Sequence, residues 1–189
     1  MRDIGAVVIG TSAGGVQALL EILPLLPSNL RVPVLSVVHI PADRTNVLAP
    51  LFASKCQVPV KEAEDKETPV PGTVYFAPSD YHLLVEANGD LALSSDEQVN
   101  FSRPSIDILF ESAADTYGER LLAVLMTGAN DDGARGLSAV AAAGGYVIVQ
   151  DPATAYARAM PEAGIKHCPS ARIESLRAIG DQLRAIVAP

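Results

Sequence analysis

Apolar positions near the N-terminus follow two spacings, one typical of strands and one typical of a helix. Residues 6–9 form a continuous apolar run that ends at Gly10, as expected for a strand buried on both faces of a sheet. Helical spacing follows at Val16, Leu19, Leu20 and Leu23. Pro24 predicts that this helix stops or bends, and residues 32–39 form a second buried strand that Pro41 closes. Strand, helix and strand in this order are typical of a βαβ unit, whose strands pair in parallel.

The middle of the chain changes to shorter apolar runs. Residues 72–76 and 81–86 have the composition of short strands. Residues 83–93 predict a β-hairpin, because Asn88-Gly89 tolerates the positive φ angles of a type I′ turn. We therefore expect an antiparallel insertion attached to the parallel sheet.

Helix and strand patterns alternate again after residue 104. The spacing predicts a helix over 105–117, a strand over 121–126, a helix over 134–143 and a strand over 146–150. A last helix is predicted from an apolar stripe made of Ile173, Leu176, Ile179, Leu183 and Ile186. The expected fold class is α/β, with a Rossmann-like, doubly wound, mostly parallel sheet, helices on both faces and a small antiparallel hairpin. We expect one domain that spans residues 1–189.

Composition narrows the partners and the compartment. The chain of 189 residues is 49% hydrophobic and 19% charged, which provides a large core and argues against a disordered chain. Its net charge of −8 argues against nucleic acid or an anionic membrane surface as the main partner, since both attract basic faces. Cys56 and Cys168 are too far apart for a CxxC pair, and no apolar stretch resembles a secretory leader or a membrane span. We expect a cytoplasmic monomer without membrane insertion.

Polar residues follow several predicted strands, where ligands of open α/β sheets bind. Ser12 lies in the loop 10–15, His39 ends the second strand, and Asp131, Asp132 and Asp151 follow later strands. A hydroxyl, an imidazole and carboxylates at one sheet edge are the inventory of a Ser-His-Asp hydrolase. Spacing alone leaves the three aspartates as alternatives for the orienting acid.

The loop 10–15 has three competing interpretations. As a dinucleotide fingerprint, GxGxxG, it has Ser12 in place of the second glycine, and the acid expected about 20 residues later is missing. As a phosphate-binding loop it has Val16 in place of the required lysine. As GxSxG it matches a nucleophile elbow, in which the glycines allow a sharp turn that exposes Ser12.

His39 precedes the candidate acids, which is not the order of α/β-hydrolases, so a triad here would be a convergent one.

Simpler roles exist for the same residues. Residues 130–133 can form a turn and a helix N-cap, and His39 can donate to a backbone carbonyl. His82 and His167 are scattered, and neither an HExxH nor a CxxC spacing occurs. We therefore expect no metal and no cofactor.

Several short motifs in a fixed order resemble the catalytic domain of the chemoreceptor methylesterase family, CheB. The main motifs are residues 10–15 (GTSAGG), 38–41 (VHIP) and 125–134 (LMTGANDDGA), with agreeing pieces at 60–63, 71–78, 103–107 and 150–155. The resemblance covers roughly residues 4–165 and is specific because the motifs agree in order and spacing.

This resemblance implies a nucleophile at Ser12, a base at His39 and an orienting acid at Asp132, the residue directly before the glycine of the family's GMGxDG pattern. It implies hydrolysis of glutamate γ-methyl esters, and deamidation of glutamines, on cytoplasmic helices of methyl-accepting chemoreceptors. The neighbourhood expected around the oxyanion includes Thr11, Ala13, Gly14 and Ala129. Ala129 stands where the family usually has methionine, and Ala159-Met160-Pro161 replaces a more common Gly-Met-Pro. These departures concern efficiency and substrate choice rather than reaction type.

Other functions stay open at this stage. The same triad could serve an esterase for another small-molecule or protein ester, or the fold could be a catalytically silent signalling module. Family members usually carry a regulatory receiver domain before the esterase, whereas the first strand here begins at residue 6. We therefore expect either an excised catalytic fragment or a stand-alone enzyme controlled by a separate regulatory protein, by localisation or not at all.

Overall fold

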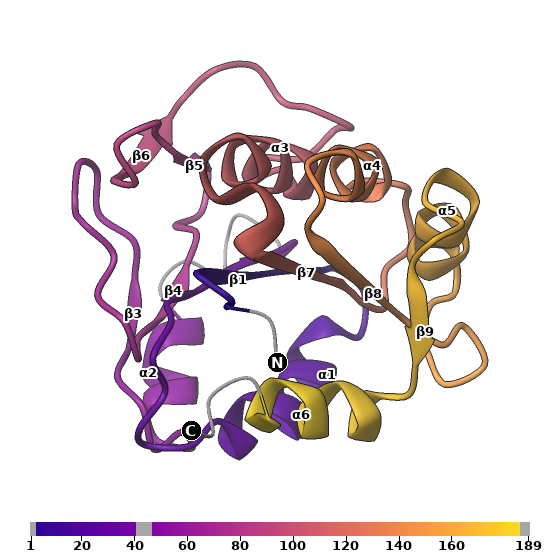
Figure 1. The fold of residues 1–189 in the computed structure, drawn as a ribbon, viewed down its shortest axis with the longest axis horizontal. Helices are drawn as coiled ribbons and strands as arrows, with labels where there is room; N and C mark the ends of the chain where they lie inside the picture. The colour runs from indigo at the N-terminus through magenta and orange to yellow at the C-terminus, as the bar shows by residue number, and fades with distance from the viewer. Residues whose placement is uncertain (1–2, 41–46, 186–189) are drawn as a thin grey trace.

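A parallel sheet runs through the middle of the molecule, and helices cover both of its faces (Figure 1). The structure, a computed structural model, describes residues 3–40 and 47–185. The strands of this sheet are β1 Ala6–Thr11, β2 Val34–Val38, β3 Val60–Glu62, β4 Val74–Phe76, β7 Leu121–Leu125, β8 Tyr146–Gln150 and β9 Arg172–Glu174. They lie in the order β3-β4-β2-β1-β7-β8-β9, and every pair is parallel. β5 His82–Val85 and β6 Leu91–Ser94 form a separate antiparallel pair.

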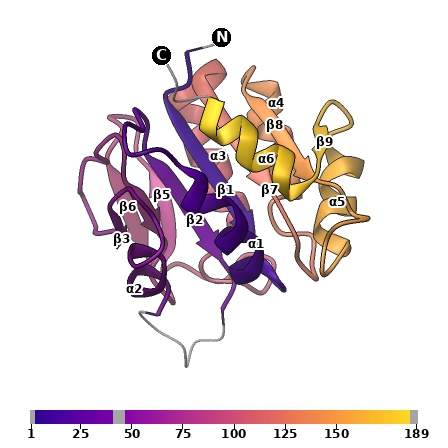
Figure 2. The same cartoon turned by 90° about the horizontal axis from the view of Figure 1, so that it is seen from below.

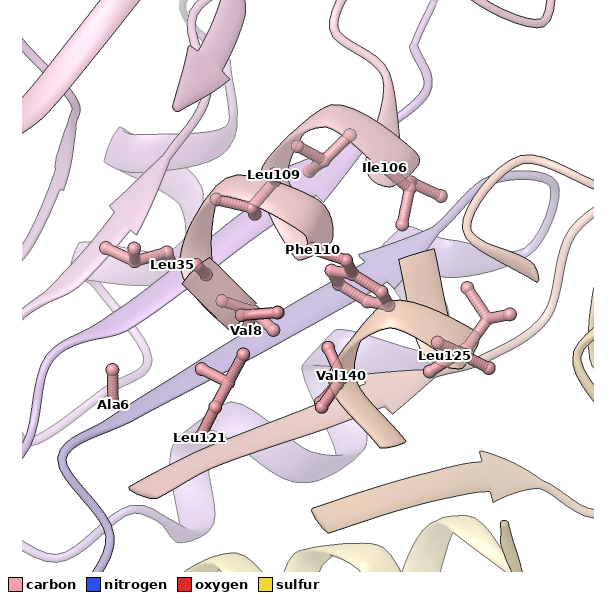
Figure 3. Packing of buried hydrophobic residues seen from close by; sticks show 14 of the residues in the cluster. Ala6, Val8, Leu35, Ile106, Leu109, Phe110, Leu121, Leu125 and Val140 are labelled. Carbon is pink, nitrogen blue, oxygen red and sulfur yellow. The ribbon is translucent and has the colours of Figure 1, made fainter. Parts of the chain in front are cut away.

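Alternate side chains of β1 enter two different hydrophobic cores. Ala6 and Val8 face a core made with α3 Ile106–Tyr117, α4 Ala134–Ala142, α5 Ala159–His167 and the β5–β6 hairpin. Figure 3 shows Leu109 and Phe110 of α3 packed over the sheet in this core. Val7 and Ile9 face the second core, made with α1 Gly15–Ile22, α2 Leu48–Ala53 and α6 Leu176–Ala185. The view from below shows α1 and α6 across this second face (Figure 2). The doubly wound α/β prediction is confirmed.

The strongly periodic elements form where the sequence predicts them. The helices over 105–117 and 134–143 and the strands over 121–126 and 146–150 each correspond to a described element within a few residues. Pro24 lies in a 3-10 turn, Leu23–Leu25, that follows α1, so the predicted bend is confirmed. No helix in residues 3–40 and 47–185 is both long and apolar enough to cross a bilayer.

Three predictions in the middle and at the end of the chain were wrong. Residues 74–76 do not join an antiparallel insertion, since β4 is buried and pairs in parallel with β2 and β3. The hairpin turn is not type I′: Gly89 has φ +91° and its N–H donates to Glu86 O at 2.8 Å, while Asn88 is not left-handed. A type I turn followed by a left-handed glycine gives this pattern. Ile173 lies in β9 and is 51% exposed, because the last helix begins only at Leu176.

Four elements had no sequence signal strong enough to predict them. α2 and β3 are short, α5 contains Pro161 and Gly164, and β9 is an edge strand of three residues. Short or interrupted elements carry too few apolar repeats for periodicity to register. The predicted roles of Pro41 and Ile186 fall outside the described residues.

Candidate active site

The candidate residues lie where the strand order reverses. From β1 the chain first adds β2, β3 and β4 on one side, with β4 between β2 and β3, and then returns through α3 to add β7, β8 and β9 on the other. Ser12 follows β1, His39 follows β2, and the loop 126–133 follows β7. Because β2, β1 and β7 are neighbours with parallel directions, their following loops meet at one edge.

His39 and Asp132 contact each other directly at this edge. His39 Nε2 lies 2.9 Å from Asp132 Oδ2, and the two side chains are 13% and 0% exposed. The His39 backbone N–H donates to Thr11 O at 3.1 Å, which fixes the histidine beside the β1 loop. Since an ionised carboxylate accepts a proton donor at Nε2, Nδ1 is the ring nitrogen left as a base.

Asp132 is held by donors from three further residues at the start of α3. Its Oδ1 accepts from the Ser105 hydroxyl at 2.8 Å and the Asp107 N–H at 3.1 Å, and its Oδ2 accepts from the Ile106 N–H at 2.7 Å. Asn100 Nδ2 donates to Oδ1 at 3.0 Å. Burial raises the pKa of the Asp132 carboxyl, but the hydrogen bonds from His39, Ile106 and Asn100 outweigh it, and the net pKa lies below its ordinary value. The carboxylate is therefore ionised and fixed in orientation.

The loop that carries Ser12 is tied to the loop after β7 through one residue, Thr127. Thr127 O accepts from the Ser12 N–H at 2.9 Å and from the Thr11 hydroxyl at 2.8 Å, and the Thr127 hydroxyl donates to Ala13 O at 2.8 Å. Gly14 adopts φ +80°, so the sharp turn predicted from the glycines is confirmed at that position. These hydrogen bonds thus fix the Ser12 loop against the loop after β7.

Two of the donors in the loop around Ser12 are already engaged in hydrogen bonds. The Ser12 N–H and the Thr11 hydroxyl are already used by Thr127 O. Within residues 3–40 and 47–185 the Ser12 hydroxyl and the Ala13 and Gly14 N–H groups have no hydrogen-bond partner. Ala13 and Gly14 therefore supply the free backbone donors next to Ser12.

The other candidate residues lie apart from this pair. Asp131 is exposed, and Asp151 Oδ1 accepts from the Ala153 N–H at 2.8 Å within its own turn. Of the three acids left open by spacing, only Asp132 contacts His39. Ala129 is exposed in the loop after β7, and no described contact joins it to Ser12 or His39. No cluster of three or more side chains suited to a metal occurs in the described part of the chain.

Sequence reasoning missed three residues that hold the site: Asn100, Ser105 and Thr127. Ser105 stands at the predicted start of a helix, which is a signal for an N-cap, but its hydroxyl serves Asp132 instead. Thr127 lies in the motif 125–134, where the acidic residues carry the stronger chemical signal. Asn100 comes from a segment without periodicity, so nothing in the sequence pointed to it.

A cavity of about 350 Å³ opens beside the imidazole. His39 and Ile40 form one side, and Gln98, residues 101–104 and the turn at Ser79-Asp80 form the rest. Arg103 is not free to bind a ligand there, because its guanidinium donates to Asp80 Oδ1 at 2.6 Å and to two backbone carbonyls. The cavity is therefore a small recess of mixed polar and apolar lining next to the His39 imidazole.

The family model described as CheB methylesterase matches residues 7–183. The chain belongs to the CheB methylesterase family. It is 36% identical to the Thermotoga maritima CheB methylesterase catalytic domain, whose crystal structure covers 98% of this chain and 100% of its own at a TM-score of 0.92. The family is one of hydrolases, and the enzyme class expected from the motifs is confirmed.

Two relatives differ in length from each other. A Leptospira interrogans protein, named provisionally as a protein-glutamate methylesterase/protein-glutamine glutaminase, is 46% identical over 161 residues, or 85% of this chain and 83% of its own. A Bradyrhizobium diazoefficiens protein with that name, from a group 3 operon, is 41% identical over 164 residues, or 85% of this chain but 45% of its own. The chain therefore matches more than four fifths of one relative and somewhat less than half of the other.

Proposed function

We propose that this CheB-family chain removes γ-methyl esters from glutamate side chains of chemoreceptor proteins through an acyl-enzyme on Ser12. The observation that carries the proposal is the His39–Asp132 pair, 2.9 Å apart and directly beside the loop that exposes Ser12. Burying a carboxylate costs desolvation free energy, and a buried carboxylate that orients a partly exposed imidazole is the arrangement found in catalytic triads.

The first half of the reaction acylates the enzyme. His39 Nδ1 takes the proton of the Ser12 hydroxyl while Oγ attacks the ester carbonyl carbon. The carbonyl oxygen becomes an oxyanion, which the free N–H groups of Ala13 and Gly14 stabilise. Asp132 holds Nε2–H and stabilises the imidazolium. The tetrahedral intermediate then expels methoxide, which leaves as methanol with the proton from Nδ1.

The second half releases the product. Water loses a proton to His39 Nδ1 and attacks the acyl carbonyl, and collapse of the intermediate returns that proton to Ser12 Oγ. The glutamate leaves as a free carboxylic acid, which ionises. A glutamine substrate follows the same path with ammonia in place of methanol, which accounts for deamidation by the same three residues.

The test is methanol release from a methylated chemoreceptor by wild type, Ser12→Ala and Ser54→Ala. Ser54 is exposed and its hydroxyl donates to Leu51 O, so it controls for loss of a serine elsewhere. We expect Ser12→Ala to lose at least about a thousandfold in kcat while Ser54→Ala matches wild type. Methanol release by Ser12→Ala at the wild-type rate would refute the proposal, and covalent labelling of Ser12 by a sulfonyl fluoride would support it independently.

We propose further that the chain acts as a monomeric single domain in the cytoplasm, where it would meet the cytoplasmic helices of the receptors. The continuous sheet from β3 to β9 supports one domain. The charge of −8 supports recognition through local contacts rather than long-range attraction to acidic helices.

A further inference from the structure

Two aromatic side chains beside the site are the most exposed large hydrophobic residues of the described chain. Phe101 is 97% exposed and Tyr156 is 84% exposed. Phe101 lines the cavity that contains His39. Tyr156 stands against the Ser12 loop, since a Cβ placed on Gly14 would lie 2.6 Å from Tyr156 Cβ. One aromatic ring thus belongs to the histidine side of the site and the other to the serine side.

Phe101 is held in place rather than carried on a loose loop. Its φ of +59° is a left-handed conformation that a bulky residue rarely adopts. The backbones of Val99 and Ser102 pair across it at 3.1 and 2.9 Å, and the side chain of the preceding residue, Asn100, donates to Asp132. The left-handed backbone thus displays a ring that no described residue covers, so the ring is available for binding.

Tyr156 is fixed by similar means. The N–H of the next residue, Ala157, donates to the Thr127 hydroxyl at 2.9 Å, and Ala157 O accepts from the Gly128 N–H at 3.1 Å. Thr127 also binds the backbone around Ser12. The position of Tyr156 is therefore tied to that of the nucleophile.

We propose that Phe101 and Tyr156 bind apolar side chains of the protein substrate that flank the esterified glutamate. This inference rests on the proposed function. A glutamate side chain spans only about 4 Å from Cα to the ester carbon, so attack by Ser12 brings the substrate backbone close to both rings. Residues one helical turn from that glutamate, about 5 Å along a helix, then fall on the rim of the site. Burying aromatic rings supplies affinity that an acidic protein does not obtain from long-range charge.

The test separates binding from chemistry. Phe101→Ser and Tyr156→Ser are compared with Ile173→Ser, which removes an apolar side chain of 51% exposure from the edge strand β9. For each variant, kcat and KM are measured for methanol release from a methylated receptor, together with the rate of Ser12 labelling by a small sulfonyl fluoride.

We expect Phe101→Ser and Tyr156→Ser each to raise KM about tenfold, the size expected when an aromatic ring that the bound substrate largely covers is lost. The kcat and the labelling rate should stay within about twofold of wild type. Ile173→Ser should leave all three unchanged. An unchanged KM in both rim variants overturns the inference, and so does an equal fall in kcat and labelling, which indicates damage to the site. If Ser12→Ala still releases methanol, the proposed function fails and this inference fails with it. If Ser12→Ala is inactive and only the KM prediction fails, the proposed function stands.

Discussion

Asn100 donates from one amide nitrogen to two buried carboxylates, Asp132 Oδ1 at 3.0 Å and Asp107 Oδ2 at 2.9 Å. The pKa values of the two carboxyl groups are shifted in opposite directions. Burial raises the pKa of Asp107, whereas the donors around Asp132 lower its pKa in spite of burial. The Asn100 amide has two N–H donors and no charge, so it can donate to both carboxyl groups. A carboxylate at this place would add a third negative charge, and a hydroxyl would have only one donor.

We predict that Asn100→Asp lowers kcat about tenfold or more and moves the acid limb of kcat/KM to higher pH. Aspartate keeps the shape and tolerates the left-handed φ of +51°, so the backbone is preserved. It removes two donors and adds a negative charge, which favours the protonated imidazolium over the neutral base. Asn88→Asp, the same change in the exposed β5–β6 turn, should match wild type. A wild-type pH profile for Asn100→Asp would contradict the role given to this amide.

At the scale of elements, β1 and α3 approach closely at Gly10. A Cβ at Gly10 would lie 2.2 Å from Ile106 Cγ2, and one at Gly133 would lie 2.6 Å from the same atom. Ile106 is also the residue whose N–H donates to Asp132 Oδ2. Gly10 therefore permits the contact of a helix with a strand end, whereas Gly14 provides the turn beside Ser12.

We predict that Gly10→Ala destabilises the protein by about 1–3 kcal/mol through overpacking and also lowers kcat, because displacement of Ile106 moves a donor of Asp132. Gly5→Ala is the matched control just before the same strand. A Cβ there would meet only the ring edge of Tyr117 at 3.3 Å and the end of Arg120 at 3.4 Å. Chemical denaturation and kcat measured on both variants check this; equal losses in the two would argue against the close approach as the cause.

The elements that the sequence predicted well are those with long apolar repeats, such as β1, α3 and α4. The pairing of β4 was predicted wrongly, because a run of three residues does not reveal which neighbours it will have. The site shows the same limit. Strand ends indicated Ser12 and His39, the family motif selected Asp132, and only the folded chain brings Asn100 to that carboxylate. A contact made by a non-periodic segment depends on the tertiary fold and leaves no local pattern.

At the scale of the whole molecule, the sheet separates two cores of unequal importance for the site. The core that includes Ile106 and Leu109 lies under α3 and α4, the helices that flank Asp132 (Figure 3). The core that includes Ile179 and Leu183 lies under α1 and α6 (Figure 2). Both stabilise the fold, but only the first supports the helix whose N-terminus binds the Asp132 carboxylate.

We therefore predict that Leu109→Ala and Leu183→Ala have similar effects on stability and different effects on catalysis. Each removes a leucine that is at most 2% exposed, and each should cost about 2–5 kcal/mol of unfolding free energy. Measured well below both melting temperatures, kcat should fall for Leu109→Ala, because α3 shifts into the cavity and carries the Ile106 N–H away from Asp132. It should be unchanged for Leu183→Ala, since α6 makes no described contact with Ser12, His39 or Asp132. Equal losses of kcat in the two variants would show that the site senses the stability of the whole fold rather than the packing of one face.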